Sequence, residues 1–375
     1  MRILYYIYSL PVGGAETVVA EYLGQLRQRG AQVLLVQDYR TESFLTRSLE
    51  EQGIPMVTLW PGSGESKLGQ TAKKAARGVG LYRRFNKVIR EFQPDVIHFH
   101  AFPDHMNRLD FPRSRMFYSF HAALERNLSM LGQKNTALLQ SLSDDGLTFC
   151  GLTSNYAKEI GARFHTDRVL FIPNGLDFDR IRSQRYSREE LQSLFGIPED
   201  AFLLGTVGRL HPVKNQERML SILREVQKSR PDARLLIVGA DQAGRADLLR
   251  RQAAELGVAD ALVLAGERRD ADAILAAMDC FLMTSHSEAL PLVAIEAQVQ
   301  GVKCVFSDAV PEDVACQDCV RLSLDESDEQ WAEAVLNASA CSGSPKTLDG
   351  YNVQTIITKL LDVYFGSCGF SRRIP

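Results

Sequence analysis

Residues 203–238, LLGTVGRLHPVKNQERMLSILREVQKSRPDARLLIV, decide the fold of this chain. The stretch opens with an apolar run at 203–207, continues through an amphipathic segment at 215–229 and closes with a second apolar run at 234–238. Short apolar runs that alternate with amphipathic segments are typical of parallel βαβ units. The stretch therefore predicts two parallel strands and the helix that connects them.

The same alternation continues in both directions along the chain. Before this stretch, strands are predicted at 3–8, 32–36, 95–99, 116–120 and 169–172, and a helix at 16–29. After it, strands are predicted at 261–264, 280–283 and 304–307, and helices at 241–256, 270–278, 291–300 and 353–365. Two sets of strands predict an α/β fold of two Rossmann-like doubly wound domains, with an interdomain cleft where ligands bind.

The domain boundary is expected next to Pro173-Asn174-Gly175, the strongest turn signal between the two sets. We expect one domain over 1–175 and a second over 176–350. The remaining segment, 351–375, is expected to form a helix that packs back towards the first domain.

Composition and charge narrow the class of protein. The chain has 375 residues, and 43 Lys and Arg against 46 Asp and Glu give a net charge of -3. This balance argues against nucleic acid as the main partner, which would favour a basic domain. No apolar run is long enough to cross a bilayer. The first eight residues could pass for a weak signal peptide, but the following Gly13-Gly14-Ala15-Glu16 favours a first strand.

The seven cysteines are scattered and odd in number, which favours a reducing cytoplasm over a disulfide framework. Cys316-Gln317-Asp318-Cys319 is a single pair without a second, so we interpret it as incidental. Asp270-Ala271-Asp272 resembles the metal-binding acid pair of some enzymes, but it opens a predicted helix, where acids cap the N-terminus. No metal site is predicted.

Two glutamates in the segment 285–296, SHSEALPLVAIE, are the first candidate site residues. Glu288 lies in the loop before a predicted helix that begins at Pro291, and Glu296 lies inside that helix. The free N–H groups at a helix start suit a diphosphate, so nearby carboxylates should turn to neutral groups such as sugar hydroxyls. The alternative is that both are solvated surface acids.

Two cations follow the strand at 203–207. Arg209 and Lys214 lie at its carboxyl end, just before the next helix. Phosphate oxygens bind both the planar fork of Arg and the point charge of Lys. Cations near a helix start are poorly placed unless an anion is bound there. The alternative is a pair of surface cations.

Further candidates follow the strands of the first domain. Gly13 and Gly14 form a tight turn that lets the backbone approach a ligand, although the full dinucleotide fingerprint is missing. His98, His100 and His121 lie at predicted strand ends, without the spacing of a zinc site.

A basic stretch at 67–90 contains interleaved apolar residues. Its cations are Lys67, Lys73, Lys74, Arg77, Arg83, Arg84, Lys87 and Arg90. One interpretation is docking on an anionic membrane surface to reach a lipid-linked acceptor. The other is a solvated helix whose apolar side faces the core, and the sequence leaves both open.

Together these segments resemble the retaining GT-B glycosyltransferases of family four, the glycosyl transferases group 1 set, over nearly the whole chain. The resemblance rests on 13–16, 94–98, Ser154-Asn155, 172–177, Gly208-Arg209 with Lys214, 266–270 and the pair Glu288 and Glu296. It implies that the first domain binds the acceptor and the second binds the nucleotide-sugar. One departure is Ala289, because the family usually has Gly after the first glutamate.

The resemblance also implies roles for individual residues. Arg209 and Lys214 would bind the donor diphosphate, Glu288 the sugar hydroxyls, and His121 would lie beside the transferred sugar. The implied donor-binding residues are Gly14, Glu267, Arg268, Ala289, Leu290, Leu292 and Glu296, with Glu296 on the ribose and Glu267 and Arg268 near the base. The implied acceptor side is Gly13, Glu16 and His100.

The resemblance implies a cytoplasmic, metal-independent, retaining hexosyltransferase with no cofactor. The donor would be a nucleotide-sugar, taken as a UDP-sugar. The acceptor would be a glycan or polyprenyl-linked molecule in bacterial capsule, exopolysaccharide or lipopolysaccharide biosynthesis, reached at the inner face of the cell membrane. Two alternatives are a nucleotide-sugar epimerase of the same architecture and a non-catalytic sugar-nucleotide binding protein.

Overall fold

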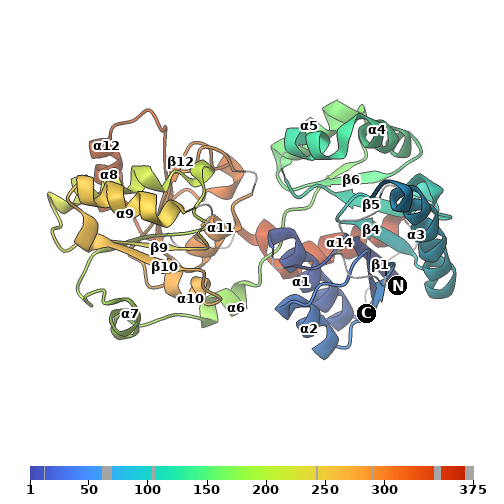
Figure 1. Ribbon diagram of the computed structural model, residues 1–375, viewed down its shortest axis with the longest axis horizontal. Coiled ribbons are helices and arrows are strands. Elements are labelled where there is room, and N and C mark those ends of the chain that lie inside the picture. The colour runs from blue at the N-terminus through green and yellow to red at the C-terminus, as the bar shows by residue number, and fades with distance from the viewer. Residues whose placement is uncertain are drawn as a thin grey trace. The chain divides into compact units, whose positions relative to one another are not determined.

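The computed structural model describes residues 1–11, 13–60, 70–103, 106–122, 124–241, 244–288, 290–341 and 348–367 (Figure 1). The chain divides into two compact units. The first unit is formed by Met1–Gly175 together with Val353–Pro375, and the second by Leu176–Asn352. The predicted α/β class with two doubly wound parallel sheets is confirmed.

The first unit contains a seven-stranded sheet with the order β3-β2-β1-β4-β5-β6-β7, in which every printed pairing is parallel. Its strands are β1 (Arg2–Ile7), β2 (Gln32–Gln37), β3 (Met56–Thr58), β4 (Val96–Phe99), β5 (Met116–Ser119), β6 (Thr148–Gly151) and β7 (Val169–Phe171). Buried runs such as residues 3–7 of β1 explain why strands of this sheet read as continuous apolar sequence.

The helices of the first unit are α1 (Gly14–Gln28), α2 (Phe44–Glu51), α3 (Gln70–Phe92), α4 (Leu124–Asp144), α5 (Ser154–Phe164) and α14 (Val353–Ser367). Helix α1 buries Val18, Val19, Tyr22, Leu23 and Leu26, which is the apolar face that the sequence spacing predicts. In Figure 1, α4 and α5 lie side by side, in agreement with their contacts.

Helix α14 comes from the far end of the chain but belongs to the first unit. It contacts α1, and its Tyr364 is completely buried. The Tyr364 hydroxyl lies 3.0 Å from the Tyr5 hydroxyl on β1, and it also hydrogen bonds Nδ1 of His98 on β4. Helix α14 is therefore anchored to the middle of the first sheet by polar as well as apolar contacts.

The second unit contains a six-stranded sheet with the order β10-β9-β8-β11-β12-β13, also parallel in its printed pairings. Its strands are β8 (Leu203–Val207), β9 (Arg234–Val238), β10 (Leu262–Gly266), β11 (Cys280–Met283), β12 (Lys303–Ser307) and β13 (Val320–Leu322). The deciding stretch at 203–238 forms β8, a helix and β9, as predicted.

Helices cover both faces of this second sheet. They are α6 (Phe178–Ser183), α7 (Arg188–Phe195), α8 (Gln216–Gln227), α9 (Arg245–Glu255), α10 (Ala271–Leu275), α11 (Leu292–Val299) and α12 (Asp328–Asn337). One core joins Phe281 and Cys304 of the sheet to Ile295 of α11, and another joins Cys280 and Val305 to helices α8 and α12. Successive strand residues enter opposite cores because side chains alternate across a strand.

Candidate donor and acceptor sites

The candidate donor site lies where the strand order of the second sheet reverses. The chain runs outward from β8 to β9 and β10, and then returns to place β11 on the other side of β8. The connections that follow β8 and β11 therefore lead to opposite edges of the sheet, and their loops begin next to each other at the carboxyl ends of the two strands. Open parallel sheets bind ligands at such a reversal point.

The loop after β8 holds Lys214 in a defined place. Residues Pro212–Lys214 form one short 3-10 turn, and Asn215 adopts the left-handed backbone conformation with φ of 50°. The backbone N–H of Val213 donates to Nδ1 of His211 at 3.1 Å. The side-chain amide of Gln216, which is buried, donates to the carbonyl of Arg209 at 3.0 Å. These bonds fix a loop that carries no regular structure beyond one turn.

The loop after β11 is tied to the loop after β8. The Thr284 hydroxyl donates to the carbonyl of Asn215 at 2.8 Å, and the backbone N–H of His286 donates to the carbonyl of Val213 at 2.8 Å. Nζ of Lys214 then donates to Oε1 of Glu288 at 2.7 Å. Two of the predicted site residues are thus brought into direct contact.

The ion pair of Lys214 and Glu288 is shielded from water. Their side chains are 21% and 9% exposed, respectively. Shielding strengthens the attraction between the charges but also raises the free energy needed to leave either one unpaired. The pair therefore places one positive and one negative charge at the reversal point of the sheet. A polar ligand that binds there can replace either residue as the partner of the other.

Arg209 lies at the end of β8, as predicted, and its side chain is exposed. Within the described ranges, no carboxylate lies at ion-pair distance from this guanidinium. Its backbone carbonyl is fixed by Gln216, but its side chain is not committed to a protein acid. Arg209 is thus placed to bind an anion that comes from solution.

Glu296 lies in the second turn of α11 and is half-buried. Burial, reinforced by the negative charge of Asp272, raises the pKa of Glu296 to about 7, and the cation of Arg180 acts in the opposite direction. A carboxyl group with this pKa is partly protonated at neutral pH, so it can donate as well as accept hydrogen bonds. Asp272 and Arg180 come from other helices, so sequence spacing does not reveal them as neighbours of Glu296.

Helix α11 begins at Leu292, with Pro291 in the N-cap position, one residue later than predicted. Leu290 and Leu292 are half-buried and pack against the core of the second unit. Ala289, which departs from the family pattern, lies outside the described residues.

Glu267 and Arg268 follow β10, and they differ in their surroundings. The side chain of Glu267 is exposed. The guanidinium of Arg268 forms two hydrogen bonds with Asp270, at 2.9 and 2.7 Å, and lies over the ring of Phe195. The Arg268 side chain is therefore occupied within the protein.

The predicted role of the acids at 270–272 as helix caps is wrong for Asp270. Asp270 occupies the N-cap position of α10, but its side chain accepts no helix N–H. It instead accepts from Arg268 and from the Tyr186 hydroxyl at 2.6 Å, while Asp272 pairs with Arg180 at 2.6 Å. Asp270 thus bonds side chains of Arg268 and Tyr186 in place of helix N–H groups. The hydrogen bond from Arg268 lowers the pKa of Asp270 to about 2.

In the first unit, Gly13 and Gly14 form the start of α1. Gly13 precedes the helix in an extended conformation, and its carbonyl accepts from the N–H of Thr17 at 2.9 Å. A Cβ atom added at Gly13 would lie 2.3 Å from Oε2 of Glu16, whereas one added at Gly14 would meet nothing within 4 Å. A side chain at position 13 would therefore require only the flexible end of the Glu16 side chain to move, and position 14 has open space.

The three histidines of the first unit form a stack at the carboxyl ends of β4 and β5. The ring centroids of His98 and His100 are 4.3 Å apart, and those of His100 and His121 are 5.1 Å apart. Nδ1 of His100 lies 2.9 Å from Nε2 of His121, so the second pair of predicted site residues is also in contact. Nε2 of His98 hydrogen bonds the Ser119 hydroxyl at 2.8 Å.

Burial keeps these imidazoles neutral. It lowers the pKa of His98 to about 3 and that of His121 to about 4, and it also lowers the pKa of His100. Nε2 of His100 and Nδ1 of His121 have no hydrogen-bond partner among the described residues. A neutral imidazole with an unused ring nitrogen is suited to bind a hydroxyl group.

Comparison with known proteins first defines the class. The chain has the fold of the GT-B glycosyltransferases, with two Rossmann-like units. The structure of Alr3699/HepE from Anabaena in complex with UDP matches 98% of this chain and 100% of its own, with a TM-score of 0.77 and 19% identity. The same protein has also been solved in complex with UDP-glucose.

Family models then identify the chain itself. Residues 12–180 match the model described as Glycosyltransferase Family 4, and residues 187–351 match the model described as Glycosyl transferases group 1. The chain belongs to the family-four glycosyltransferases, as the sequence resemblance predicts.

Two relatives extend this comparison. EpsF of Bacillus subtilis, a protein assigned as a glycosyltransferase, is 31% identical over 61% of this chain and 60% of its own length. A second relative is the UDP-Gal:alpha-D-GlcNAc-diphosphoundecaprenol alpha-1,3-galactosyltransferase of Escherichia coli. It is 26% identical over 52% of this chain and 54% of its own length. The matched part thus spans less than two thirds of either relative. Among the described residues, no helix is both long and apolar enough to cross a membrane.

Proposed function

We propose that this protein is a retaining glycosyltransferase that moves a sugar from a UDP-sugar to a glycan or polyprenyl-linked acceptor. The observation that carries the proposal is the 2.7 Å contact between Lys214 and Glu288, together with the uncommitted side chain of Arg209, which follows the same strand as Lys214. A nucleotide-sugar presents both chemistries that this group recognises, an anionic diphosphate and neutral hydroxyls. Membership of family four and the UDP complexes of Alr3699/HepE support the choice of donor.

Donor binding rearranges the ion pair in this proposal. Lys214 turns from Glu288 to the diphosphate, Arg209 binds the same group, and Glu288 then accepts hydroxyl groups of the sugar. The diphosphate compensates Lys214 and the hydroxyls satisfy Glu288, so neither group is left unpaired. The loop bonds from Thr284 and His286 hold the two backbones in place during this exchange.

Electrostatic stabilisation of the leaving group drives the reaction. As the bond from the anomeric carbon to the diphosphate breaks, negative charge grows on the phosphate next to Arg209 and Lys214. Fixed cations at the position of developing charge lower the barrier without reorganisation. We propose that these two cations take the part that a divalent metal plays in other transferases, so that no metal or cofactor is needed for the transfer itself.

Roles for the remaining candidates follow from their chemistry. The partly protonated Glu296 binds the ribose hydroxyls, and the backbone around Glu267 and Arg268 holds the base. In the first unit, the neutral His121 binds a hydroxyl of the transferred sugar. The turn of Gly13, Gly14 and Glu16, together with His100, lines the acceptor side.

The acceptor pathway is proposed to be bacterial surface-polysaccharide biosynthesis at the cytoplasmic face of the membrane. The E. coli relative acts on a diphosphoundecaprenol-linked sugar, which supports a lipid-linked acceptor. In α3, Leu81, Phe85 and Ile89 are buried, whereas Arg83, Arg84, Lys87 and Arg90 are exposed. The described part of this helix therefore favours electrostatic docking over apolar insertion. The other cations of the basic stretch lie at 67–77, outside the described side chains.

Ligand-induced thermal stabilisation tests the donor site. UDP and UDP-glucose should raise the melting temperature of the purified protein in a concentration-dependent way, because a ligand that binds the folded state stabilises it. Lys214→Ala should weaken UDP binding, while Lys228→Ala, which removes an exposed cation from the same unit, should not. An unchanged UDP affinity in Lys214→Ala would remove the basis of the proposal.

Product analysis tests the reaction. The protein, a UDP-sugar and a membrane extract containing polyprenyl-linked acceptors should yield a glycosylated lipid in the presence of EDTA. Its new linkage, followed by NMR, should keep the anomeric configuration of the donor. An isomerised UDP-sugar formed without acceptor would indicate an epimerase, and binding without any product would indicate a sugar-nucleotide binding protein.

A further inference from the structure

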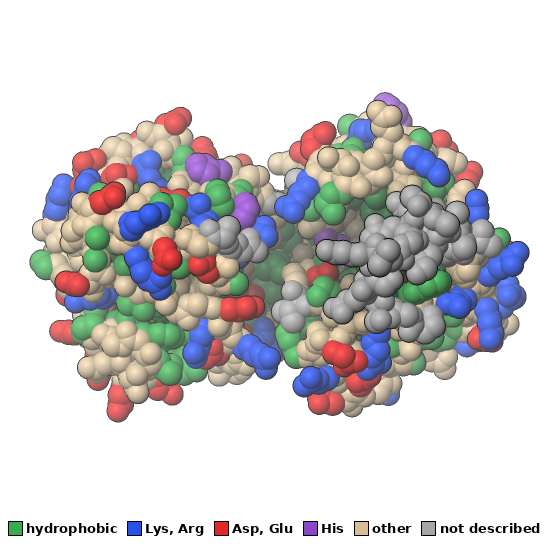
Figure 2. All heavy atoms as spheres, viewed as in Figure 1, with side chains coloured by type: hydrophobic (Ala, Val, Ile, Leu, Met, Phe, Trp, Pro, Cys, Tyr) green, Lys and Arg blue, Asp and Glu red, His purple; other side chains and the backbone are tan. Residues whose placement is uncertain are grey.

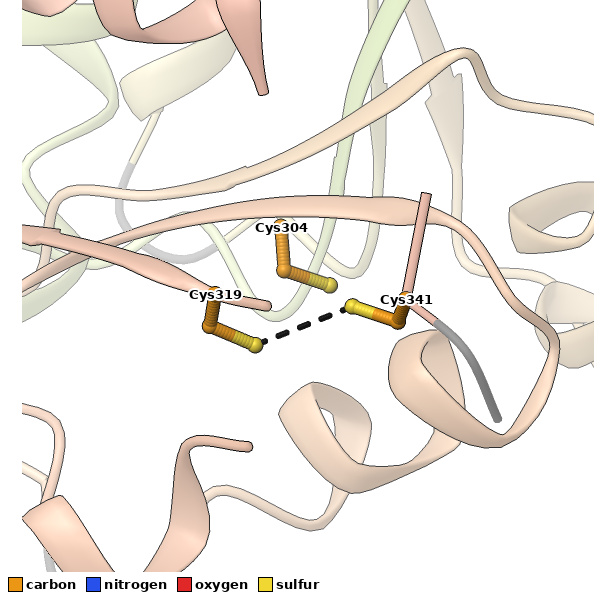
Figure 3. A group of neighbouring side chains, drawn as sticks. All are labelled: Cys304, Cys319 and Cys341. Carbon is orange, nitrogen blue, oxygen red and sulfur yellow. Dashed lines mark hydrogen bonds between the residues drawn. The ribbon is translucent and has the colours of Figure 1, made fainter. Parts of the chain in front are cut away.

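Four cysteines of the second unit converge although they are distant in sequence. Cys304 lies on β12, Cys316 and Cys319 lie between β12 and β13, and Cys341 follows α12. The ligand atoms of Cys304, Cys319 and Cys341 all lie within 4.8 Å of one another (Figure 3). We call these four residues the thiol cluster.

Three sulfurs of the thiol cluster, those of Cys304, Cys319 and Cys341, lie around one point, and the sulfur of Cys316 lies beside that of Cys319. Sγ of Cys319 lies 3.4 Å from Sγ of Cys316 and 3.8 Å from Sγ of Cys341. Sγ of Cys304 completes this group, because it lies within 4.8 Å of Sγ of Cys319 and of Sγ of Cys341.

This spacing fits a tetrahedral metal better than a disulfide. Four thiolates at about 2.3 Å from a Zn²⁺ ion lie about 3.8 Å from one another in a regular tetrahedron. A disulfide joins only two sulfurs, at about 2.0 Å. The Cys316-x-x-Cys319 turn has the short ligand spacing of structural zinc sites, and Cys304 and Cys341 supply the second pair that the sequence did not reveal.

The surroundings of the thiol cluster are those of a structural site. Cys304, Cys316 and Cys341 are buried in the core beneath α11, and Cys319 is half-buried at its edge. The backbone N–H of Cys316 donates to Oε1 of Gln298 at 2.7 Å, and Gln298 is a completely buried residue of α11. The turn that carries two ligands is therefore fixed before any metal binds.

We propose that Cys304, Cys316, Cys319 and Cys341 bind one structural Zn²⁺ ion. Borderline-soft zinc prefers thiolate ligands, and a closed set of four leaves no open position for a substrate. The ion links β12, the segment before β13 and the segment after α12. It also supports α11 through Gln298.

The proposed zinc site is separate from the donor site. Cys304 lies at the second position of β12, and Cys319 immediately precedes β13. The thiol cluster is therefore at the amino ends of these strands, whereas Arg209, Lys214 and Glu288 follow the carboxyl ends of β8 and β11. A zinc ion here would stabilise the fold and leave the transfer reaction independent of metal.

Metal analysis of the purified full chain tests this site. The wild-type protein, produced in zinc-containing medium and desalted, should carry one zinc per chain by mass spectrometry of the elements. Cys319→Ala and Cys341→Ala should lose this zinc. Cys280→Ala is the matched control, because Cys280 is buried in the same sheet but enters the opposite core, and it should keep the metal.

Cobalt and thiol measurements distinguish the other outcomes. Co²⁺ added to the metal-free protein should give the intense visible bands of a tetrahedral thiolate complex, and Cys319→Ala should abolish them. The denatured wild-type protein should show seven reactive thiols after the metal is removed. Two thiols fewer would indicate a disulfide, bound iron with inorganic sulfide would indicate a cluster, and all seven thiols with no zinc or cobalt binding would indicate free cysteines. Each of these results would overturn the proposal.

Discussion

Nζ of Lys214 and Oε1 of Glu288 are 2.7 Å apart although the two residues are 74 positions apart in sequence. Each follows one of the two neighbouring strands between which the second sheet reverses its order. The contact is therefore a direct product of the sheet topology, and it brings a cation and an anion to the place where such sheets bind ligands.

The first prediction concerns the coupling between these two charges. Lys214→Met and Glu288→Gln should each destabilise the protein by about 1–3 kcal/mol, because each leaves a shielded polar partner unsatisfied. The free energy of unfolding of the double variant should fall by less than the sum of the two single losses. Urea denaturation of the four proteins measures the coupling in a double-mutant cycle. Strictly additive losses would show that the contact contributes nothing to stability.

The second prediction concerns Glu296, whose pKa rises from an ordinary value of 4.5 to about 7. The folded state holds this proton more strongly than the unfolded state does. This contribution to stability is therefore complete below about pH 4.5 and is lost as the pH rises to about 7. Glu296→Gln should remove this loss of stability. At pH 8 its free energy of unfolding should exceed that of the wild type by up to about 3 kcal/mol.

Denaturation at several pH values checks this prediction. Glu255→Gln, which changes an exposed acid of α9, is the control and should follow the wild-type curve. Asp272→Asn should lower the pKa of Glu296, because Asp272 is the charge that raises it. Equal pH profiles for wild type and Glu296→Gln would show that the carboxyl group is not perturbed.

The third prediction concerns Tyr364 and the core of the first unit. Tyr364→Phe removes the hydroxyl that contacts both Tyr5 and His98. Two buried groups then lose a partner, so the free energy of unfolding should fall by about 1–3 kcal/mol. Tyr118→Phe is the control, because Tyr118 is a buried tyrosine of the same sheet whose hydroxyl forms no hydrogen bond with the described residues. Similar losses in both variants would assign the effect to packing alone.

The fourth prediction concerns the histidine stack. Because burial lowers the pKa of His121 to about 4, its imidazole signals in NMR spectra should be constant from pH 8 down to about pH 5. His121→Gln identifies these signals by their absence. The unfolded chain takes up this proton near pH 6.5, so the contribution of His121 to stability is lost as the pH falls from about 6.5 to 4. A titration midpoint between pH 6 and 7 in the folded protein would contradict this.

Much of the fold could be predicted from the sequence, because most strands are buried runs. The bounds of β8, β9 and β11 agree with the predicted ranges to the residue. Three strands were missed, namely β3, β6 and β13. Strands β3 and β13 are short and only half-buried, whereas β6 is buried but has only two apolar residues, Phe149 and Cys150, between Thr148 and Gly151. Helix α10 is shorter than the predicted 270–278, since it ends at Leu275.

The candidate site was less accessible to sequence reasoning, because its contacts join distant segments. The positions of Arg209, Lys214 and Glu288 after their strands could be predicted, but the direct contact of Lys214 with Glu288 could not. No sequence pattern predicts that Asp272 lies near Glu296 or that Tyr364 contacts His98. The two cysteine pairs of the thiol cluster were missed for the same reason, since only Cys316 and Cys319 are close in sequence.

The return of α14 to the first unit has a consequence for synthesis on the ribosome. The second unit is continuous, at 176–352, and can complete its sheet as soon as those residues emerge. The first unit begins earlier but lacks the Tyr364 hydroxyl for His98 until residue 364 has been translated, which is after the whole second unit. The half that is made first is therefore the half that finishes folding last.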